Sequence, residues 1–298
     1  MGDSPVKGRT VVVTGAARGV GAALANELAR RGARLALLDH DGPALEERAA
    51  ALPNAPLTLE VDVTDYPALT DTAEVVRGRL GPPSVVVANA GIAEGGPFAL
   101  SDPATWRRVI DVNLTGSAQT ARAFLPDLVE TAGYHLQIAS LASIGAVPMM
   151  SAYCASKAGV EAFTHALRAE VAHRGVAVGI AYLNWTGTDM IRDADRFTAL
   201  RELRTHMPPL ARRVSRVEVV AERLARAVES RTTAVYVPAW LRLVQVARAA
   251  LPPVILRVSR RELPRLQAEE ALVSSGLLGA GGRADRAATR RRTRSRPE

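Results

Sequence analysis

A glycine-rich turn between an apolar strand and an alanine-rich helix constrains the fold more than any other stretch of the chain. Residues 10–14, Thr-Val-Val-Val-Thr, predict a short strand, and the turn Gly15-Ala-Ala-Arg-Gly-Val-Gly21 runs straight into the helix. Gly15 permits the tight turn, Gly19 lets the backbone approach a pyrophosphate, and Gly21 lets the helix pack on its strand. A glycine cluster alone is a weak signal, but this order of elements predicts a phosphate site at the helix N-terminus.

A second strand at residues 34–39 follows this helix after Gly32, a predicted C-cap, and ends in Asp39. A carboxylate at this point accepts hydrogen bonds from the adenosine ribose hydroxyls and repels a 2′-phosphate. Asp39 therefore favours NAD over NADP. Two alternatives stay open, because Asp39 could simply face solvent at a strand end and Arg18 could attract a phosphate.

Strand and helix signals alternate along the rest of residues 1–238. Strands are predicted at residues 57–61, 84–88, 134–140, 176–183 and 234–237, and helices at residues 44–51, 67–80, 101–133, 151–174 and 215–230. This alternation indicates an α/β fold, with a Rossmann-type doubly wound sheet of seven parallel strands and right-handed crossovers. The ends of parallel strands share one sheet edge, so Asp62-Val63 and Asn89-Ala-Gly91 are expected where ligands bind.

Three side chains between Ser140 and Lys157 predict a proton-transfer device. Tyr153 and Lys157 project from one face if they lie on a helix, and Ser140 would reach that face from the preceding strand. A fixed cation lowers the pKa of a phenol by stabilising the phenolate. Such a Tyr-x-x-x-Lys pair could also lie on the solvent-exposed face of a helix without a catalytic role. However, only Lys7 and Lys157 among the 38 Lys and Arg residues are lysine, which indicates that position 157 requires a compact ammonium.

The net charge of +8 is concentrated near the C-terminus. Residues 276–298 hold seven arginines and two carboxylates, whereas residues 239–275 hold six arginines and three glutamates, so residues 1–238 are close to neutral. Residues 240–261 form a basic amphipathic segment that could lie on an anionic membrane, cover the active site or form a subunit contact. Pro252-Pro253 favours the packed alternatives because it breaks a long helix. Residues 276–298 lack periodicity and predict a disordered tail, with no specific nucleic-acid binding.

These properties predict one catalytic domain at residues 1–238, an extension at residues 239–275 and the tail at residues 276–298. The chain has no signal-peptide pattern and no run of about 18 uncharged apolar residues, so we expect a cytoplasmic protein, with surface membrane association left open. Its single cysteine, Cys154, cannot form an internal disulfide, and no metal site is expected.

Motifs that agree in order and spacing resemble the short-chain dehydrogenase/reductase family over most of residues 6–238. They are Thr14-Gly-x-x-x-Gly-x-Gly21, Asp39, Asp62-Val63, Asn89-Ala-Gly91, Asn113, Ser140 and Tyr153-x-x-x-Lys157. The resemblance implies that Tyr153 is the general acid/base, that Ser140 holds the substrate oxygen, and that Lys157 binds the nicotinamide ribose and lowers the phenol pKa. Asn113 would support a water in the proton relay. Ser143 is a competing serine whose spacing to Tyr153 fits the family pattern less well.

The same resemblance implies a nicotinamide cofactor site, in which Asp62 and Val63 contact the adenine and Thr188 contacts the carboxamide. The implied cofactor-binding residues are Gly15, Arg18, Gly19, Val20, Gly21, Asp39, Asp62, Val63, Asn89, Ala90, Gly91, Tyr153, Lys157 and Thr188. One departure concerns Leu183-Asn184, which stands where the family has Pro-Gly beside the nicotinamide. Asparagine has less backbone freedom than glycine, so nicotinamide placement is the least certain implication.

We expect an NAD-dependent enzyme that interconverts a secondary alcohol and a ketone on an apolar, lipid-like or polycyclic substrate. Loop residues of apolar and flexible character should surround the reactive oxygen, or else pack a lid at residues 189–214 on the body; they are Met149, Met150, Trp185, Met190 and Phe197. The alternative function is a catalytically weak family member that binds cofactor or regulates. The resemblance also suggests a homodimer or homotetramer built through the helices that carry Asn113 and Tyr153.

Overall fold

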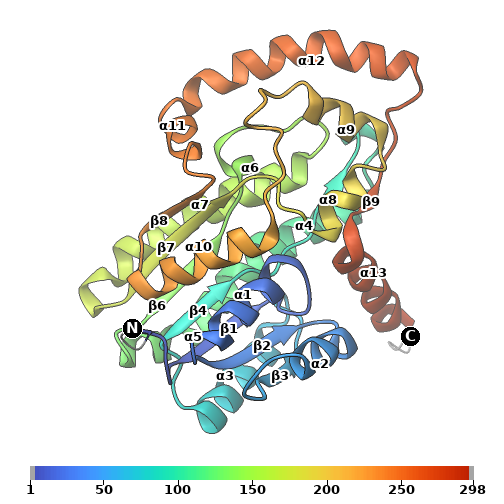
Figure 1. The fold of residues 1–298 in the computed structure, drawn as a ribbon. Helices are drawn as coiled ribbons and strands as arrows, with labels where there is room; N and C mark the ends of the chain where they lie inside the picture. Colours follow the sequence, from blue (N-terminus) through green and yellow to red (C-terminus); the bar gives the residue numbers. More distant parts are fainter. Residues whose placement is uncertain (1–3, 295–298) are drawn as a thin grey trace.

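The computed structural model describes residues 4–294 and contains the predicted seven-stranded parallel sheet (Figure 1). The strand order is β3-β2-β1-β4-β6-β7-β8, and every neighbouring pair is parallel. The strands are β1 (Thr10–Thr14), β2 (Arg34–Asp39), β3 (Leu57–Glu60), β4 (Val85–Ala88), β6 (Tyr134–Ile138), β7 (Ala177–Leu183) and β8 (Ala234–Val237). The strand order reverses between β1 and β4, which is the position where doubly wound sheets bind ligands. The predicted single Rossmann-type domain is confirmed.

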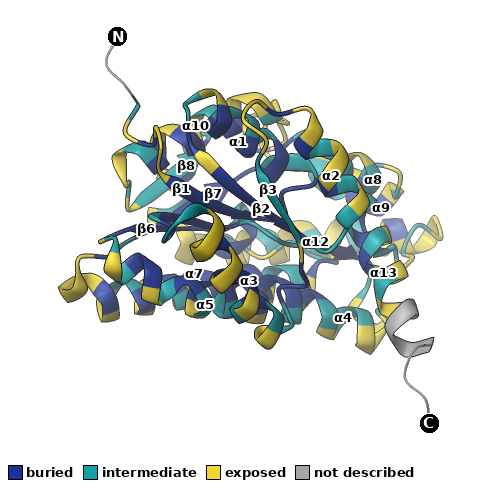
Figure 2. Cartoon of the chain, turned by 90° about the horizontal axis from the view of Figure 1, so that it is seen from below, coloured by how far each residue is buried: buried dark blue, intermediate teal, exposed yellow. Residues whose placement is uncertain are grey.

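Helices cover both faces of this sheet, and the strands form a buried middle layer (Figure 2). One face packs against α1 (Gly19–Arg30), α2 (Gly42–Ala50) and α10 (Val217–Ser230). The other face packs against α3 (Tyr66–Leu80), α4 (Pro103–Ile110), α5 (Gly116–Glu130) and α7 (Ser151–Val171), which continues as the short 3₁₀ turn η3 (Ala172–Arg174).

The valines of β1 show why the strand sequences are nearly continuous runs of apolar residues. Val11 and Val13 pack into the core beneath α1, whereas Val12 packs into the core beneath α3 and α5, and none of the three is exposed to solvent. Successive strand residues point to opposite faces, so a sheet covered on both sides requires apolar residues at every position.

The helix predicted at residues 101–133 is interrupted by a π-helical turn around Asn113. Asp102 caps α4, whose first residue is Pro103, and the π-helical turn η2 (Asp111–Thr115) then separates α4 from α5. Such single π turns inside α-helices are frequent at functional sites. This one contains Asn113, whose side chain is completely buried.

The lid and the extension lie on the side of the sheet edge where ligands bind. The lid contains α8 (Asp189–Ala194) and α9 (Thr198–Thr205), and the extension contains α11 (Leu241–Val246), η4 (Arg248–Ala250) and α12 (Leu251–Ala268). Pro252 and Pro253 occupy the first turn of α12, where proline is tolerated, so they begin that helix and do not interrupt it. Within residues 4–294, no helix combines the length and hydropathy needed to span a membrane.

The prediction of a disordered tail is wrong for residues 276–294. They form β9 (Gly276–Leu277), which pairs antiparallel with β5 (Glu94–Gly95), and α13 (Gly279–Arg294), which packs beside α8 (Figure 1). Leu277 and Leu278 are buried, and Asp285 pairs with Arg108. The order comes from partners elsewhere in the chain, which local composition cannot reveal. Residues 295–298 of the predicted tail lie outside the described residues.

Candidate active site

The glycine turn has the close backbone contacts that a phosphate loop needs. Gly15 has a φ of +64°, and a Cβ at this position would lie 2.8 Å from the Cα of Ala90. A Cβ on Gly21 would lie only 2.2 Å from the Gly15 carbonyl oxygen, so any side chain there would push α1 away from β1. No side chain caps the N-terminus of α1, which leaves its first amides available to an anion. Gly19 approaches the methyl group of Thr188.

The loop after β4 is tied to the same turn. The Asn89 side-chain amide donates hydrogen bonds to the carbonyl oxygens of Thr14 (2.9 Å) and Gly15 (3.1 Å). In return the Thr14 hydroxyl accepts hydrogen bonds from the backbone amides of Asn89 (3.0 Å) and Ala90 (3.1 Å). These bonds fix the ends of β1 and β4 together at the switch point.

Asp39 lies at the end of β2 with its carboxylate in the cleft. It accepts hydrogen bonds from the backbone amides of Ala17 (3.0 Å) and Asp41 (3.1 Å), and only 8% of the residue is exposed. The solvent-facing alternative for Asp39 is therefore wrong. Its neighbour His40 is half-buried. Burial lowers the pKa of this imidazole, but a hydrogen bond with Asp39 and nearby carboxylates outweigh that effect and raise the pKa above its ordinary value.

Arg18 lines the cleft, but its charge already has a partner. The guanidinium forms an ion pair and a hydrogen bond with Asp41. Burial alone would raise the pKa of Asp41, yet the Arg18 hydrogen bond and a backbone hydrogen bond hold it below its ordinary value. A phosphate would have to compete with this carboxylate for Arg18.

Ser140 and Ser143, the two candidate serines, have different surroundings. Ser140 caps the short helix α6 (Leu141–Ile144), and its hydroxyl accepts a hydrogen bond from the Ala142 backbone amide (3.2 Å). The Ser143 hydroxyl accepts a hydrogen bond from the Ser140 backbone amide (3.3 Å), so it faces the backbone of the capping turn. Of the two, only Ser140 lines the cleft beside Tyr153.

Tyr153 and Lys157 open α7 on one face, as the spacing predicts. The Lys157 ammonium lies 5.8 Å from the centroid of the Tyr153 ring and donates a hydrogen bond to the Ile138 carbonyl oxygen (3.1 Å). Burial lowers the pKa of Lys157 to about 8. Burial also raises the pKa of Tyr153, and the nearby Ser140 hydroxyl opposes this rise only in part. The expected lowering of the Tyr153 pKa by Lys157 is therefore not seen in the protein alone.

Asn113 lies behind the cleft and ties three elements together. Its side-chain oxygen accepts a hydrogen bond from the Ile92 amide (2.8 Å), and its side-chain nitrogen donates to the Ile92 carbonyl oxygen (2.9 Å) and the Ser156 hydroxyl (2.9 Å). This is the buried tying role that an asparagine within a helix can have. Support of a relay water by Asn113 stays a prediction.

Leu183 and Asn184, the departure from the family pattern, line the cleft at the end of β7. Asn184 does not have a positive φ, so the backbone here needs no glycine. Its side-chain nitrogen donates to the Ala211 carbonyl oxygen (2.9 Å), which ties the lid to the sheet. Thr188 follows at the cleft wall, directly before α8.

A second, mostly apolar cavity adjoins the cleft and shares Tyr153 with it. Met150, Trp185 and Met190 line it, whereas Met149 and Phe197 pack in the hydrophobic cluster around it. Three of the five therefore line a cavity next to Tyr153 and two pack around it; whether they contact a substrate stays a prediction. Burial raises the pKa of the Cys154 thiol, and its sulfur contacts the Val147 backbone. Among residues 4–294, no group of His, Cys, Asp or Glu side chains could hold a metal ion.

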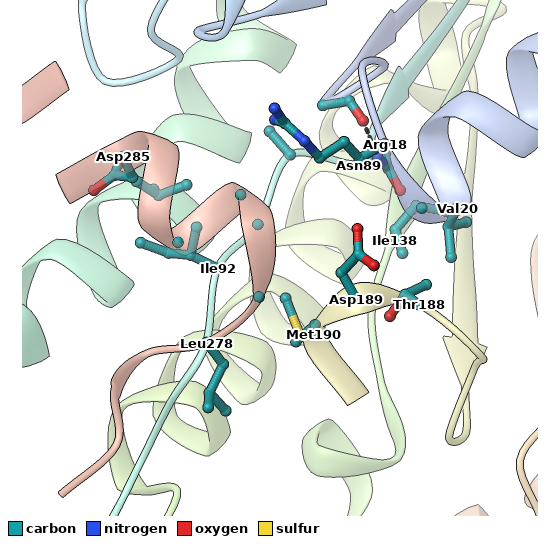
Figure 3. Close-up of a pocket in the computed structure, with 18 of the residues that line it drawn as sticks. Arg18, Val20, Asn89, Ile92, Ile138, Thr188, Asp189, Met190, Leu278 and Asp285 are labelled. Carbon is teal, nitrogen blue, oxygen red and sulfur yellow. Dashed lines mark hydrogen bonds between the residues drawn. The ribbon is translucent and has the colours of Figure 1, made fainter. Parts of the chain in front are cut away.

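The cleft brings together nearly all the residues that the sequence singled out. Of the implied catalytic and cofactor-binding residues, Gly21 and Asn113 are the two that do not line it; each packs directly behind it. Sequence reasoning missed several cleft residues on other elements, namely His40, Arg108, Leu278 and Asp285. The sequence held only weak signals for two of them. His40 directly follows Asp39, and Asp285 is one of two carboxylates in an arginine-rich segment. Figure 3 shows Leu278 and Asp285 across the pocket from Arg18 and Thr188.

Comparison with known proteins identifies the family. A family model described as short chain dehydrogenase matches residues 9–198. The chain belongs to the short-chain dehydrogenase family. It is 34% identical over 221 residues to galactitol 2-dehydrogenase (L-tagatose-forming) of Cereibacter sphaeroides, which is 73% of this chain and 87% of that relative. It is 32% identical to 2-(S)-hydroxypropyl-CoM dehydrogenase 3 of Xanthobacter autotrophicus, over 58% of this chain and 69% of the relative.

Other relatives share only this domain or lack activity. The chain is 37% identical to the probable oxidoreductase EphD of Mycobacterium tuberculosis, but it spans only 29% of that protein's length. It is also 34% identical to a Xanthobacter autotrophicus relative named inactive 2-(S)-hydroxypropyl-CoM dehydrogenase 2, over 53% of this chain and 69% of the relative.

Among solved structures, a short-chain dehydrogenase/reductase of Burkholderia phymatum in complex with NAD superposes on this dehydrogenase with a TM-score of 0.72. It is 25% identical, over 82% of this chain and 94% of that one. The dehydrogenase is thus an oxidoreductase of a family that uses a nicotinamide cofactor. The cleft fits such a group, because Gly21 leaves space where a Cβ would collide, the α1 amides are uncapped, and the Asp39 carboxylate lines the cleft at the end of β2.

Proposed function

We propose that this dehydrogenase oxidises a secondary alcohol to a ketone on an apolar substrate, with NAD as cofactor and Tyr153 as the general base. One observation carries the proposal. Ser140 and Tyr153 line both the dinucleotide cleft and the adjoining apolar cavity, so a substrate oxygen held by both hydroxyls would have its carbon between the two spaces.

The chemistry requires a proton acceptor beside a hydride acceptor. A bound nicotinamide would supply the acceptor for the hydride of the substrate carbon, and its oxidised ring would add a positive charge to the site. Tyr153 takes the proton from the substrate hydroxyl, and Ser140 donates a hydrogen bond to the oxygen as negative charge develops there. The Lys157 ammonium donates one of its three N–H groups to the Ile138 carbonyl oxygen. The other two N–H groups would be available to a ribose hydroxyl and to the phenolate oxygen of Tyr153.

The preference for NAD rests on charge at the adenosine end of the cleft. Asp39 is buried with its carboxylate in the cleft, and the positive charge of Arg18 is paired with Asp41. A 2′-phosphate would meet one carboxylate and would have to displace another from its guanidinium. Tighter binding of NADPH than NADH in a fluorescence titration would refute this part of the proposal.

The apolar substrate class rests on the lining of the second cavity. Its walls include Val147, Met150, Trp185 and Ala194, and the polar groups there are few and lie near Tyr153 and Asn184. Flexible thioethers and an aromatic ring suit an irregular apolar molecule. A panel of secondary alcohols, scored by NADH absorbance, should show activity rising with apolar surface.

Tyr153→Phe tests the catalytic assignment because it removes the phenolic hydroxyl and little else. We expect turnover to fall by at least about 10³-fold while the Kd for NADH stays within about threefold. Turnover near the wild-type level would exclude Tyr153 as the acid/base.

The second candidate is a family member that binds cofactor without efficient catalysis. A relative whose name calls it inactive and the Leu183-Asn184 departure favour it, whereas the retained Ser140, Tyr153 and Lys157 argue against it. Tight NADH binding without turnover across the alcohol panel would support this candidate over the first.

Peripheral membrane contact and self-association also stay proposals. Leu243, Val246 and Val254 are largely exposed, and four arginines of α11 and α12 have no ion-pair partner among residues 4–294; they are Arg242, Arg257, Arg260 and Arg261. Such a surface suits anionic lipid. Flotation with phosphatidylserine vesicles tests it, with phosphatidylcholine vesicles as the control. Light scattering tests for a homodimer or homotetramer built through the helices carrying Asn113 and Tyr153.

A further inference from the structure

The C-terminal segment forms part of the wall of both cavities. Leu278 lines the dinucleotide cleft and the apolar cavity beside Tyr153, and Asp285 lines the cleft at its adenosine end (Figure 3). Both residues are nearly inaccessible to solvent, at 1% and 2% exposure. The glycine-rich start of α13 lies between them along the same wall. Residues 278–285 are therefore far in sequence from every motif of the dinucleotide fold.

Backbone and side-chain bonds hold this segment in place at two points. The Leu278 amide donates to the Ala93 carbonyl oxygen (2.8 Å), in the segment that leads into β5. The Gly279 amide donates to the Asp193 carboxylate (2.8 Å), which joins α13 to α8. A Cβ on Gly279 would lie 2.8 Å from the Met190 Cα, so the start of α13 packs directly against the α8 backbone.

Arg108 connects the segment to the adenosine end of the cleft. Its Nη2 donates to Asp62 (2.9 Å) and to Asp285 (2.6 Å), and its Nε also donates to Asp285 (3.0 Å). Asp62 belongs to the pair expected to contact adenine. One guanidinium therefore fixes Asp285 beside the adenine-contacting residue.

The resulting group is rich in carboxylates. Asp39, Asp62 and Asp285 line the cleft with the imidazole of His40 and two guanidinium groups. Arg108 is shared by Asp62 and Asp285, and Arg18 is paired with Asp41. The carboxylates of Asp39, Asp62 and Asp285 all act to raise the pKa of His40, which places the three within electrostatic reach of one ring. A low-dielectric cleft strengthens such a field.

We propose that residues 278–285 form the outer wall of the cofactor site, and that Asp285, held by Arg108, is a specificity residue that disfavours a 2′-phosphate. The proposal rests on the proposed use of NAD. It adds an acidic residue from outside the dinucleotide fold to the discrimination attributed to Asp39. It also gives the α13 segment a role in cofactor binding.

Hydrogen exchange on the wild-type full-length protein, with and without saturating NADH, tests the wall. We expect slower exchange of amides in both residues 15–21 and residues 279–285. Slower exchange in residues 15–21 alone would overturn the wall and leave the proposed cofactor intact. Unchanged exchange in both would overturn the proposed cofactor use and, with it, the wall.

Asp285→Asn tests specificity, and Glu269→Gln is the control because it removes an exposed carboxylate from the neighbouring extension. Fluorescence titrations would give the ratio of the Kd for NADPH to the Kd for NADH. We expect this ratio to fall about tenfold in Asp285→Asn and to stay unchanged in Glu269→Gln. An unchanged ratio in Asp285→Asn would reduce Asp285 to a structural anchor. Should this variant misfold, Asp285→Glu, which keeps the charge, must retain the wild-type ratio, and a tenfold fall there would contradict the proposal.

Discussion

The side-chain amide of Asn184 donates a hydrogen bond to the carbonyl oxygen of Ala211 at 2.9 Å, and a longer one to that of Arg213 at 3.4 Å. Asn184 stands at the end of β7, whereas Ala211 and Arg213 belong to the lid. The residue that departs from the family pattern therefore makes a contact that glycine could not make. Asn184 has less backbone freedom than the glycine of the family pattern, but its side chain ties the lid to the end of β7.

Asn184→Gly should loosen the lid. Loss of two hydrogen bonds and a gain in unfolded-chain entropy should lower the free energy of unfolding by about 1–2 kcal/mol in urea titration. Trypsin should then cleave faster after Arg212 and Arg213, as measured by mass spectrometry. Asn54→Gly is the control, because Asn54 is exposed at a φ of +66°, where glycine is favoured. Equal cleavage rates in wild type and Asn184→Gly would contradict the lid contact.

Gly21→Ala and Gly78→Ala should have opposite effects. A Cβ at Gly21 would lie 2.2 Å from the Gly15 carbonyl oxygen, so α1 must shift and NADH affinity should fall at least about tenfold. Gly78 lies within α3 and a Cβ there meets nothing within 4 Å, so alanine should stabilise the protein by about 0.5–1 kcal/mol. Thermal melts and NADH titrations measure both variants. Normal NADH binding by Gly21→Ala would be incompatible with this loop geometry.

Lys157→Met should stabilise the protein near neutral pH. Burial lowers the pKa of Lys157 to about 8, against about 10.5 in the unfolded chain, so the folded protein binds fewer protons between these values. The burial penalty is thus complete below about pH 8 and disappears as pH rises towards 10.5. After allowing for the unpaired Ile138 carbonyl, methionine should add about 1–3 kcal/mol at pH 7 and progressively less above pH 8. The exposed Lys7 gives the control Lys7→Met. A stability difference that grew with pH would refute the assignment.

Asn113→Ala should be strongly destabilising. It leaves the buried amide and carbonyl of Ile92 without their partner, so we expect a loss of about 2–4 kcal/mol in urea titration. Ser156→Ala removes only one of the three hydrogen bonds of Asn113, and its loss should be about 1 kcal/mol. Similar losses in the two variants would show that Asn113 does not tie η2 to the loop after β4.

The sequence predicted much of the fold because the controlling interactions are local. Glycine φ preferences fix the turn at Gly15, the apolar run of β1 requires a sheet covered on both faces, and helical spacing places Tyr153 and Lys157 on one face. The same periodicity could not reveal the π turn around Asn113. Within that turn, the Asn113 side chain accepts a hydrogen bond from the Ile92 amide on another element, which periodicity cannot show.

The sequence by itself determined the dinucleotide fold, the family and the grouping of Ser140, Tyr153 and Lys157, since each follows from neighbours in the chain. Tertiary structure alone decided the electrostatics and the outer wall of the site. Burial, and not the nearby ammonium, sets the direction of the Tyr153 pKa shift, and burial cannot be read from spacing. Residues 276–294 looked disordered because their composition offers no core of their own, yet they are ordered by Ala93, Asp193 and Arg108. Those contacts join residues that lie far apart in the sequence, so local composition cannot reveal them.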